Sequence, residues 1–512
     1  MPKININLSI LVFFLSVFVF FSSGHFGGDG IENYLTARSV VIEQDLSIYD
    51  DSFGVKEMRY DSTKKNRVTG RGGKIYSSYA MGMPILLLPL FFLGHIVSLI
   101  VKGVPADYIT QFFVSLTNPI IYACMALFIF MILQKLKYSK QIAFITALVS
   151  SFCTMNLIYA RSGFSDPAVA LFFLISGYFL LRYFQKGPLF SVLLSGAAFS
   201  YAVFIKKHFI IYILCYLLIF YIAYKRDKNI LKAAKAVFAF LVPVGICILL
   251  ILIFNYLRFG GALNTEFGTP SDMLSKGTTG ARYIKASYYY LLSSGKGYLF
   301  FNIPLILALF GIRGFLKKQS LFGIFALSLI MLNLAFCVWI FQRGSLFSWG
   351  PRYLLLTVPF MSIFMAEFIA QAKEPFKRFT IILLSSLGFL VQFPCLFINN
   401  SKWLFFIKEQ LQQKEYMINF IPDLSPIKGC WILFISMIKN LISGESMAYA
   451  YNPDPLLVKR IAASLSGYDI MDTWWFHTMK LYPVLMPYTI FSIVLLFLLV
   501  SLSLLSIRRE LK

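Results

Sequence analysis

Apolar runs recur along the whole chain, and most are close to the roughly 20 residues that cross a hydrocarbon core. The polar stretches between them are short, except at 24–82, 256–298 and 399–485. This pattern predicts an all-α polytopic membrane protein with about 12–13 transmembrane helices. The predicted spans lie at approximately 7–23, 110–133, 141–159, 165–184, 190–206, 209–224, 236–255, 299–316, 320–341, 352–370, 379–398 and 486–506.

Lysines and arginines cluster in every second loop between these runs, as the positive-inside rule expects of cytoplasmic loops. The remaining loops would then share the extracytoplasmic side, among them 24–82, 160–166 and 399–485. The positive loops contain Lys135, Lys137, Lys140, Arg182, Lys186, Lys225, Arg226, Lys228, Arg313, Lys317, Lys318, Lys373, Lys377, Arg378, Arg508 and Arg509.

One further apolar stretch, 83–101, does not fit this alternation. If it crossed the membrane as well, the loop at 24–82 and the positive loop at 135–140 would share a side. Pro84, Pro89 and Gly94 interrupt the stretch, so we expect an interfacial or re-entrant helix there. The first run presents a different choice, because its length and the small residues that follow it also resemble a cleavable signal peptide.

Composition excludes a soluble protein. Of the 512 residues, 58% are hydrophobic and only 14% are charged, whereas a soluble chain keeps about a quarter charged. The net charge of +24 follows from the cytoplasmic loops, so no nucleic-acid partner is expected. The seven cysteines show no CxxC or metal spacing, and the four histidines show no HExxH or paired spacing. These spacings argue against a disulfide framework and against a histidine-built metal site.

Two extracytoplasmic regions have structure of their own. From Ile31, apolar residues recur on one helical face, which predicts an amphipathic helix along the membrane surface. The region 399–485 holds four of the six tryptophans, a residue type that is typical of the membrane–water interface. They are Trp403, Trp431, Trp474 and Trp475.

Two acids lie on the predicted extracytoplasmic face. Asp29 lies between glycines a few residues after the first run, and Asp166 precedes Pro167 at the start of another. Either could simply cap a helix N-terminus. Two carboxylates at the mouth of one bundle could also divide proton abstraction and substrate positioning between them. The spacing leaves both interpretations open.

Three cations stand outside the positive-inside pattern. Lys74, Lys296 and Arg352 are each flanked by glycine or proline at the start of an apolar run. A lipid-linked phosphate would need such cations, and arginine offers a planar, bidentate fork. The alternative is ordinary snorkelling to phospholipid headgroups. Acids within the spans are few, Glu367 being the clearest, which disfavours an ion-coupled transporter.

The order of these motifs resembles bacterial polyprenyl-phosphate-dependent glycosyltransferases of the C-type superfamily, in the branch of aminoarabinose transferases and protein O-mannosyltransferases. The resemblance covers about residues 5–370 and does not extend to 399–485. Its motifs are Asp29-Gly30 with Tyr34, Ala37 and Arg38, then GKIYS at 73–77, Pro84 to Pro89, SDP at 165–167, NTEFGTP at 264–270, SGKG at 294–297 and WGPRY at 349–353.

This resemblance implies an inverting transfer of a sugar from a polyprenyl-phosphate carrier to a lipid, glycan or protein acceptor. The reaction would take place at the outer face of the bacterial inner membrane. Asp29 matches the general base of the first loop, and Asp166 matches the second-loop acid that helps to position substrate. The matched substrate-binding candidates are Lys74, Tyr76, Lys296, Arg352 and Tyr34.

The resemblance also implies that the first span is retained and that no metal cofactor is needed, although oligosaccharyltransferase relatives use one. The clearest acidic pair in the first loop, Asp50-Asp51, is adjacent rather than spaced. Many relatives follow the first-loop Asp with Glu, whereas Gly30 stands here. Glu32 could share a helix face with Asp29 and take the place of that neighbour, so it is a further catalytic candidate.

The expected organisation has three parts. Residues 1–398 form the transmembrane glycosyltransferase module, 399–485 an extracytoplasmic region without assigned role, and 486–512 the last transmembrane helix with its cytoplasmic tail. A transporter or flippase of lipid-linked sugars is the alternative function, and a membrane scaffold explains the spans but not the ordered motifs.

Overall fold

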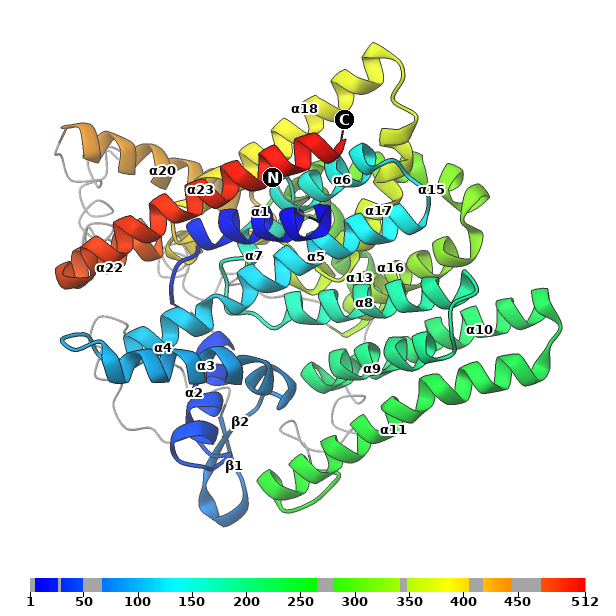
Figure 1. Cartoon of the computed structure of the whole chain (residues 1–512), viewed down its shortest axis with the longest axis horizontal. Helices are drawn as coiled ribbons and strands as arrows, with labels where there is room; N and C mark the ends of the chain where they lie inside the picture. Colours follow the sequence, from blue (N-terminus) through cyan, green and yellow to red (C-terminus); the bar gives the residue numbers. More distant parts are fainter. Residues whose placement is uncertain are drawn as a thin grey trace.

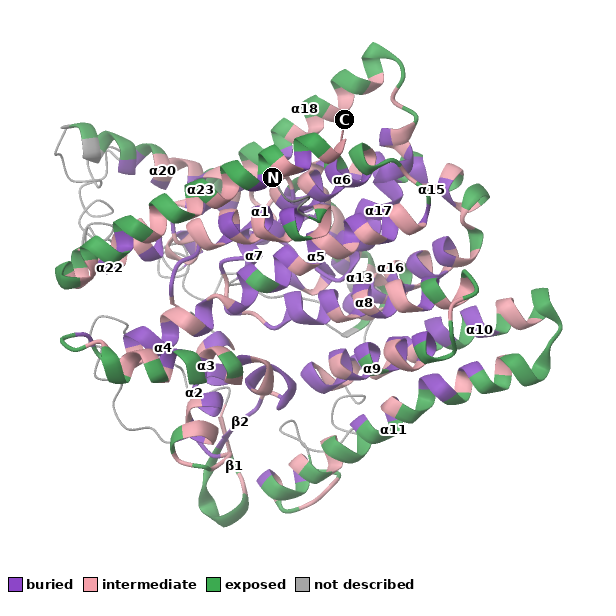
Figure 2. Cartoon of the chain, viewed as in Figure 1, coloured by how far each residue is buried: buried purple, intermediate pink, exposed green. Residues whose placement is uncertain are grey.

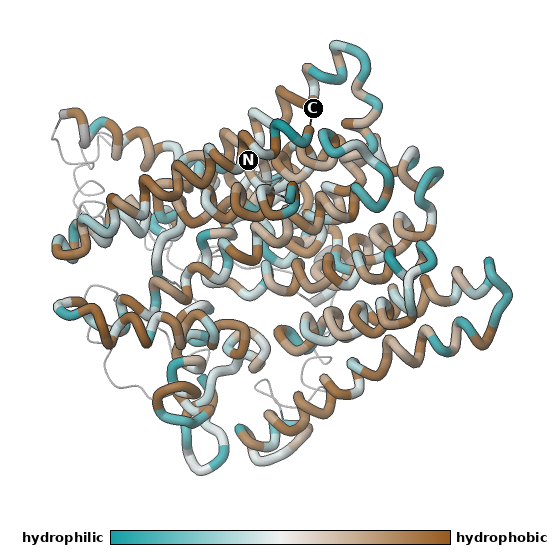
Figure 3. The backbone as a smooth tube through the Cα atoms, in the orientation of Figure 1, coloured by the Kyte–Doolittle hydropathy of each residue, from teal (hydrophilic) through white to brown (hydrophobic). Residues whose placement is uncertain are grey.

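The computed structural model describes residues 5–25, 29–48, 67–264, 280–340, 348–404, 418–443 and 471–511. Its long apolar helices lie roughly side by side, and their polar turns gather at the two ends (Figures 1 and 3). The main helices are α1 (Ile6–Phe20), α5 (Thr117–Lys135), α6 (Lys140–Phe152), α8 (Asp166–Phe184), α9 (Phe190–Ile205), α10 (Ile213–Asp227), α11 (Ile230–Phe259), α15 (Ile306–Lys318), α16 (Ser320–Ile340), α17 (Thr357–Ala370), α18 (Pro375–Gln392) and α23 (Met486–Leu511).

Shorter elements connect these helices. A two-stranded antiparallel sheet pairs β1 (Arg67–Thr69) with β2 (Ile75–Ser77), with Val68 opposite Tyr76. The remaining elements are α2 (Asp29–Ile42), η2 (Arg71–Gly73), α3 (Gly82–Ile100), α4 (Ala106–Ser115), α7 (Asn156–Tyr159), η3 (Lys207–Tyr212), α13 (Gly280–Leu292), α14 (Tyr298–Phe301), η4 (Ile303–Leu305), η5 (Arg352–Leu354), η6 (Phe393–Leu396), η8 (Pro422–Leu424), α20 (Pro426–Ser443), α22 (Trp474–Leu481) and η9 (Pro483–Leu485).

Among the described residues, eight helices are long and apolar enough to cross a membrane, and four more apolar helices are shorter. The outer faces of α11, α18 and α23 are largely exposed (Figure 2), and their exposed side chains are predominantly apolar, as lipid contact requires. The prediction of an all-α polytopic membrane protein is confirmed.

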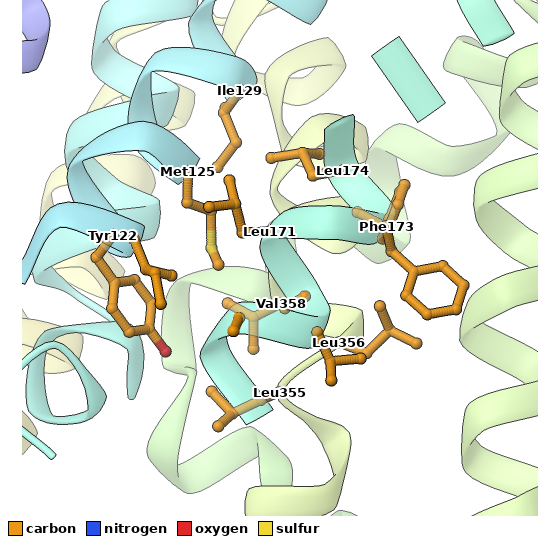
Figure 4. Close-up of a cluster of buried hydrophobic side chains, with 14 of the residues drawn as sticks. Tyr122, Met125, Ile129, Leu171, Phe173, Leu174, Leu355, Leu356 and Val358 are labelled. Atoms are coloured by element: carbon orange, nitrogen blue, oxygen red, sulfur yellow. The ribbon is translucent and has the colours of Figure 1, made fainter. Parts of the chain in front are cut away.

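The buried centre is built from α5, α8 and the beginning of α17. Figure 4 shows Tyr122, Met125 and Ile129 of α5 facing side chains of α8 and of the segment that enters α17. Buried serines join α8 to α9, because Ser176 and Ser195 hydrogen-bond through their hydroxyls at 2.9 Å. Small residues and interhelical hydrogen bonds are the usual means of holding helices together in lipid.

The loops predicted to be cytoplasmic contact one another at one end of the bundle. Lys140 pairs with Glu510 at 2.9 Å, and Gln185 donates to the Lys135 carbonyl at 2.8 Å. Asp166 lies at the other end of α8, about 28 Å away for a helix of 19 residues. The two predicted sets of loops therefore occupy opposite ends of the bundle.

The stretch 83–101 forms α3, which is long and apolar enough to span a membrane. Its geometry indicates otherwise. The carbonyl of Gly82, at its beginning, accepts from Tyr201 near the end of α9 that leads to Lys206. Val97, near its end, packs against the same small cluster around Tyr108 as Leu485, directly before α23 begins. Both ends of α3 thus lie at the same end of the bundle, in agreement with the interfacial prediction.

The predicted amphipathic helix is α2, but it is enclosed more fully than a surface helix would be. Tyr34 and Leu35 are buried as the pattern predicts, yet polar Asn33 and Thr36 are buried as well. Ile42, assigned to the apolar face, is 42% exposed. Protein therefore surrounds most of the circumference of α2, and its position at the membrane surface stays a prediction.

The tryptophans of the region 399–485 make specific contacts with protein. The indole of Trp474 donates to the Val19 carbonyl at 2.8 Å, and that of Trp475 donates to the Phe20 carbonyl at 3.2 Å. These bonds reach carbonyls in the last turn of α1, where an α-helix leaves its carbonyls without the usual intrahelical partner. The segment that begins at Met471 is thereby attached to the end of the first span.

Candidate active site

Arg352 joins the two predicted acids. It lies in η5, directly after Pro351, and its side chain is 8% exposed. One guanidinium nitrogen lies 2.9 Å from Asp29 Oδ2, and Nε lies 3.6 Å from Asp166 Oδ2. The Phe164 ring lies against the guanidinium, 4.3 Å away from its carbon. The first loop, the second loop and the beginning of α17 therefore meet at a single cation.

Asp166 is also bound by Lys206, whose Nζ lies 2.5 Å from Oδ1. The N-cap of α8 is Ser165, and Asp166 is already the first helical residue with Pro167 after it. The interpretation of Asp166 as the helix cap is therefore wrong. Its side chain, 6% exposed, instead holds two cations in place.

Asp29 is the more accessible acid, with 23% of its side chain exposed. It begins α2, and the Tyr79 hydroxyl lies beside it. Burial, the charge of Asp29 and a hydrogen bond to its carboxylate raise the pKa of Tyr79 well above the usual value, so this hydroxyl stays protonated and donates. Arg258, buried at the end of α11, holds the Tyr79 segment by donating to the Ser77 and Tyr79 carbonyls at 3.0 and 2.9 Å.

Lys296 is fully buried in the turn before α14. Its ammonium donates to the backbone carbonyl of Ser348, in the WGPRY segment that also carries Arg352. Burial, followed by the charge of Arg352, lowers the pKa of Lys296 well below its usual value. A buried cation next to a second cation is an arrangement that an anionic ligand would stabilise.

Two polar atoms at the centre of the site lack a hydrogen bond. Within the described ranges, no hydrogen-bond partner reaches Arg352 Nε or Asp166 Oδ2, and both atoms are buried. The two atoms face each other as an ion pair at 3.6 Å, which is longer than a hydrogen bond. A small shift of the guanidinium would therefore leave both atoms free to bind a ligand or water.

Gly30 is required by the way the two loops approach. A Cβ atom built there would lie 2.9 Å from Gly163 Cα and 3.0 Å from its carbonyl oxygen. Backbone of the second loop therefore occupies the space that a side chain at this position would need. This contact gives a steric reason why a residue without a side chain follows Asp29 here.

The other predicted site residues lie apart from Arg352 or face elsewhere. Glu32 is one turn after Asp29, but its carboxylate pairs with Arg67 of β1 at 3.2 Å. Lys74 is 49% exposed and pairs with Asp45 at 2.5 Å. The roles predicted for Glu32 and Lys74 stay predictions.

The two tyrosines have packing roles in the structure. The hydroxyl of Tyr34 lies 2.6 Å from Thr110 Oγ1 and 3.3 Å from Asp107, at the contact of α2 with α4. Tyr76 is buried in β2, where its ring packs edge-on against Phe259. Substrate binding by these tyrosines also stays a prediction.

Sequence reasoning missed Lys206, Tyr79 and Arg258. Lys206 and Lys207 stand at a turn that the topology places outside, and two lysines there run against the positive-inside rule. That departure was a usable signal. Tyr79 and Arg258 offered none, because a tyrosine in a loop and an arginine at the end of a span are both common at membrane interfaces.

The described site contains two carboxylates and three cations, contributed by segments from across the chain. It can bind an anion through Arg352, Lys206 and Lys296, and it offers one accessible carboxylate beside that anion. Predicted first-loop residues at 26–28 and 49–66, and motif residues at 265–270, lie outside the described residues.

No protein-family model matches the chain, and no curated protein matches it. Among solved structures, the chain is similar to ArnT from Cupriavidus metallidurans in the apo state, with a TM-score of 0.43, 12% identity and coverage of 98% of this chain and 76% of that one. It is also similar to ArnT from the same organism bound to undecaprenyl phosphate, with a TM-score of 0.43, 14% identity and coverage of 98% and 77%.

Proposed function

We propose that this protein is an inverting glycosyltransferase that moves a sugar from a polyprenyl-phosphate carrier to a hydroxyl acceptor at the extracytoplasmic face of a bacterial inner membrane. The observation that carries the proposal is the buried Arg352, shared by an accessible Asp29 and a buried Asp166. The motif resemblance of residues 5–370 suggests the reaction class, and the site geometry supports the roles that we propose for individual residues.

In this proposal Arg352 and Lys296 bind the carrier phosphate. A guanidinium has five donors in a fixed fork, and Arg352 Nε has no hydrogen-bond partner among the described residues. The second cation would stabilise the charge that develops on the phosphate as the bond to the sugar breaks. Buried cations act strongly here because little water screens them.

Asp29 would serve as the general base. The acceptor hydroxyl becomes acidic as its oxygen attacks the anomeric carbon, so a carboxylate within hydrogen-bond reach can take its proton. A phosphate bound at Arg352 would compete with Asp29 for that guanidinium. Binding of the donor would thereby release the carboxylate from its ion pair and make it available to the acceptor.

Asp166 would position the cations. It is almost fully buried and holds Lys206 at one oxygen and Arg352 at the other. Because each of its oxygens faces a cation, this acid fixes the orientation of the guanidinium. The division between an accessible and a buried carboxylate is therefore a division between proton transfer and positioning.

The test replaces Asp29 with asparagine in the full-length protein. In a deletion strain, D29N should be present in membranes at the wild-type level, while sugar transfer falls by about 10²–10⁴-fold, the usual contribution of a general base. Mass spectrometry of surface glycans and of carrier lipids would identify the sugar and acceptor and measure the loss. Lys377→Ala, at the opposite end of the bundle, is the matched control and should transfer normally.

Undiminished transfer by D29N would remove Asp29 from the role of base. Reconstituted wild-type protein that moves a labelled polyprenyl-phosphate sugar across the bilayer, and never releases the carrier phosphate, would show a flippase instead. The position of Glu367 speaks against that alternative. It lies near the end of α17 and pairs with Lys318 at 2.6 Å, far from a mid-membrane site.

A further inference from the structure

A second cluster of titratable side chains lies at the end of α1, separate from the ion pairs of Arg352. His25 Nε2 is 3.0 Å from Asp472 Oδ1, and His477 Nε2 is 3.4 Å from the same oxygen. The two imidazole rings are 5.3 Å apart between centroids. One ligand atom from each of the three residues lies within 4.8 Å of the other two.

The carboxylate of Asp472 is held in a fixed orientation. Arg161 binds its other oxygen, Oδ2, at 3.3 Å. The same guanidinium donates to the backbone carbonyl of Cys395, and the backbone amide of Asp472 donates to the Phe397 carbonyl at 2.7 Å. Oδ1 of Asp472 therefore faces the two imidazoles. Arg161 holds the carboxylate in this orientation, as an outer partner does for a metal-binding carboxylate.

Two of the three separations between the ligand atoms are close to those of a tetrahedral metal site. Bonds of about 2.0–2.1 Å to nitrogen and oxygen give ligand–ligand edges of about 3.3 Å in a tetrahedron. The separations of Asp472 Oδ1 from the two imidazole nitrogens, 3.0 and 3.4 Å, lie on either side of that value, and all three ligand atoms lie within 4.8 Å of one another. Hydrogen bonding alone would require both imidazoles to donate Nε2–H to one oxygen, while a shared metal would use the two nitrogen lone pairs.

We propose that His25, Asp472 and His477 bind a Zn²⁺ ion that fastens the beginning of the first extracytoplasmic loop to the segment entering α22. Two imidazole nitrogens and one carboxylate oxygen are a usual zinc donor set, with a water in the fourth position.

The ion would affect the chemistry by fixing the positions of the two loops that carry Asp29 and Asp166. His25 precedes Asp29 by only four positions in the chain, and Arg161 precedes Asp166 by five. The ion and its outer partner would thus fix the approach of both loops whose acids meet at Arg352. This inference does not depend on the proposed sugar transfer, because metal binding can be measured without any substrate.

The experiment uses the full-length protein, purified in detergent through a tag without histidines. The protein is stripped with a chelator and titrated with Zn²⁺ alone, and the bound metal is measured by elemental mass spectrometry. Wild type should bind one ion per chain and gain thermal stability on binding. His477→Gln should weaken binding by at least about tenfold, since loss of an outer partner alone costs that much. His95→Gln, on α3, is the matched control and should bind as wild type does.

Co²⁺ gives an independent reading of the ligands. Wild type loaded with Co²⁺ should show the visible absorption of a four-coordinate site, and H477Q should not. His25→Gln offers a second variant if H477Q fails to fold. Wild-type protein that binds no Zn²⁺, or H477Q that keeps one tightly bound ion with the same spectrum, would show that the cluster is held by hydrogen bonds only.

Discussion

Carboxylates pair with cations at both ends of the helix bundle, but the two clusters of ion pairs differ in their burial and in their partners. At one end, Arg352 is 8% exposed and is shared by Asp29 and Asp166, which come from two different loops. At the other, Lys318 is 58% exposed and pairs with Glu367, whose oxygens also accept from Tyr138 and Gln371 at 2.7 and 2.6 Å.

The difference shows what distinguishes a candidate site from an interhelical tie. Glu367 keeps two neutral donors if Lys318 moves away, and that lysine loses little by entering water. If Arg352 moved away, the carboxylates of Asp29 and Asp166 on two loops would lose a counter-charge. Within the described part of the chain, Arg352 Nε and Asp166 Oδ2 also lack hydrogen bonds. Convergence and incomplete satisfaction, more than the presence of an ion pair, indicate a place for a ligand.

The largest expected effect comes from removing the shared cation. Arg352→Ala leaves Asp29 with no counter-charge from Arg352 and Asp166 with Lys206 alone. Breaking a buried pair in this way costs about 3–5 kcal/mol, so thermal unfolding in detergent should occur at a clearly lower temperature. Arg352→Lys restores the charge without the fork. It should recover much of the stability and little of the sugar transfer. Equal stability of R352A and wild type would contradict the proposed arrangement.

A smaller effect is expected at the contact of the two loops. Gly30→Ala places a methyl group against the Gly163 backbone, at 2.9 Å from its Cα. Overpacking of this kind costs about 1–3 kcal/mol, and it should also separate Asp29 from Arg352 and reduce transfer. Gly245→Ala on α11 is the control, since open space surrounds its Cβ position. Both the unfolding temperature and the initial rate of sugar transfer should fall in G30A, and neither should fall in G245A.

Lys296 allows function and stability to be separated. Lys296→Met removes a buried charge whose pKa is lowered by burial and by Arg352. We expect sugar transfer to fall while the stability of the folded protein stays unchanged or rises, as replacement of buried charges by apolar groups often shows.

The dependence of this stability difference on pH follows from the lowered pKa of Lys296. The charged form of Lys296 destabilises the folded state at low pH, and this destabilisation becomes smaller as the pH rises. The stability difference between K296M and wild type should therefore narrow at alkaline pH. If the difference in stability between K296M and the wild-type protein did not become smaller at alkaline pH, this account would be contradicted.

The smallest effect is expected at the opposite end. Lys318→Ala removes an exposed partner of Glu367, and an exposed pair contributes only about 0–1 kcal/mol. Unfolding temperature should change slightly, and sugar transfer should stay at the wild-type rate. A loss comparable to that of R352A would erase the distinction between the two ends.

The sequence predicted that Asp29, Asp166 and Arg352 lie at the same end of the bundle, because the positive-inside rule and the motif order act over the whole chain. It could not give the partners of these side chains. Glu32 was expected beside Asp29 from helical spacing, yet the structure turns its carboxylate toward Arg67, which is 35 residues away. Such pairings depend on tertiary packing, which local periodicity does not encode.

The histidines show the same limit more clearly. Their spacing argued against a histidine-built metal site, because such motifs are recognised when ligands are close in sequence. His25 and His477 lie near opposite ends of the chain, and the bonds of Trp474 and Trp475 to the end of α1 help to bring them together. The spacing of residues in the sequence gives no information about distant side chains that the fold brings together.

Arg352 follows Asp29 by 323 positions, and this separation has a consequence for biosynthesis. At about 5–20 residues per second, the ribosome needs on the order of half a minute to make the arginine after the aspartate has emerged. During that interval the first loop waits at the membrane surface without its counter-ion. Asp166 can pair with Lys206 earlier, but the contact that joins the first loop to the second through Arg352 forms last. A chain that stalls before η5 carries every first-loop motif, yet its Asp29 cannot pair with Arg352.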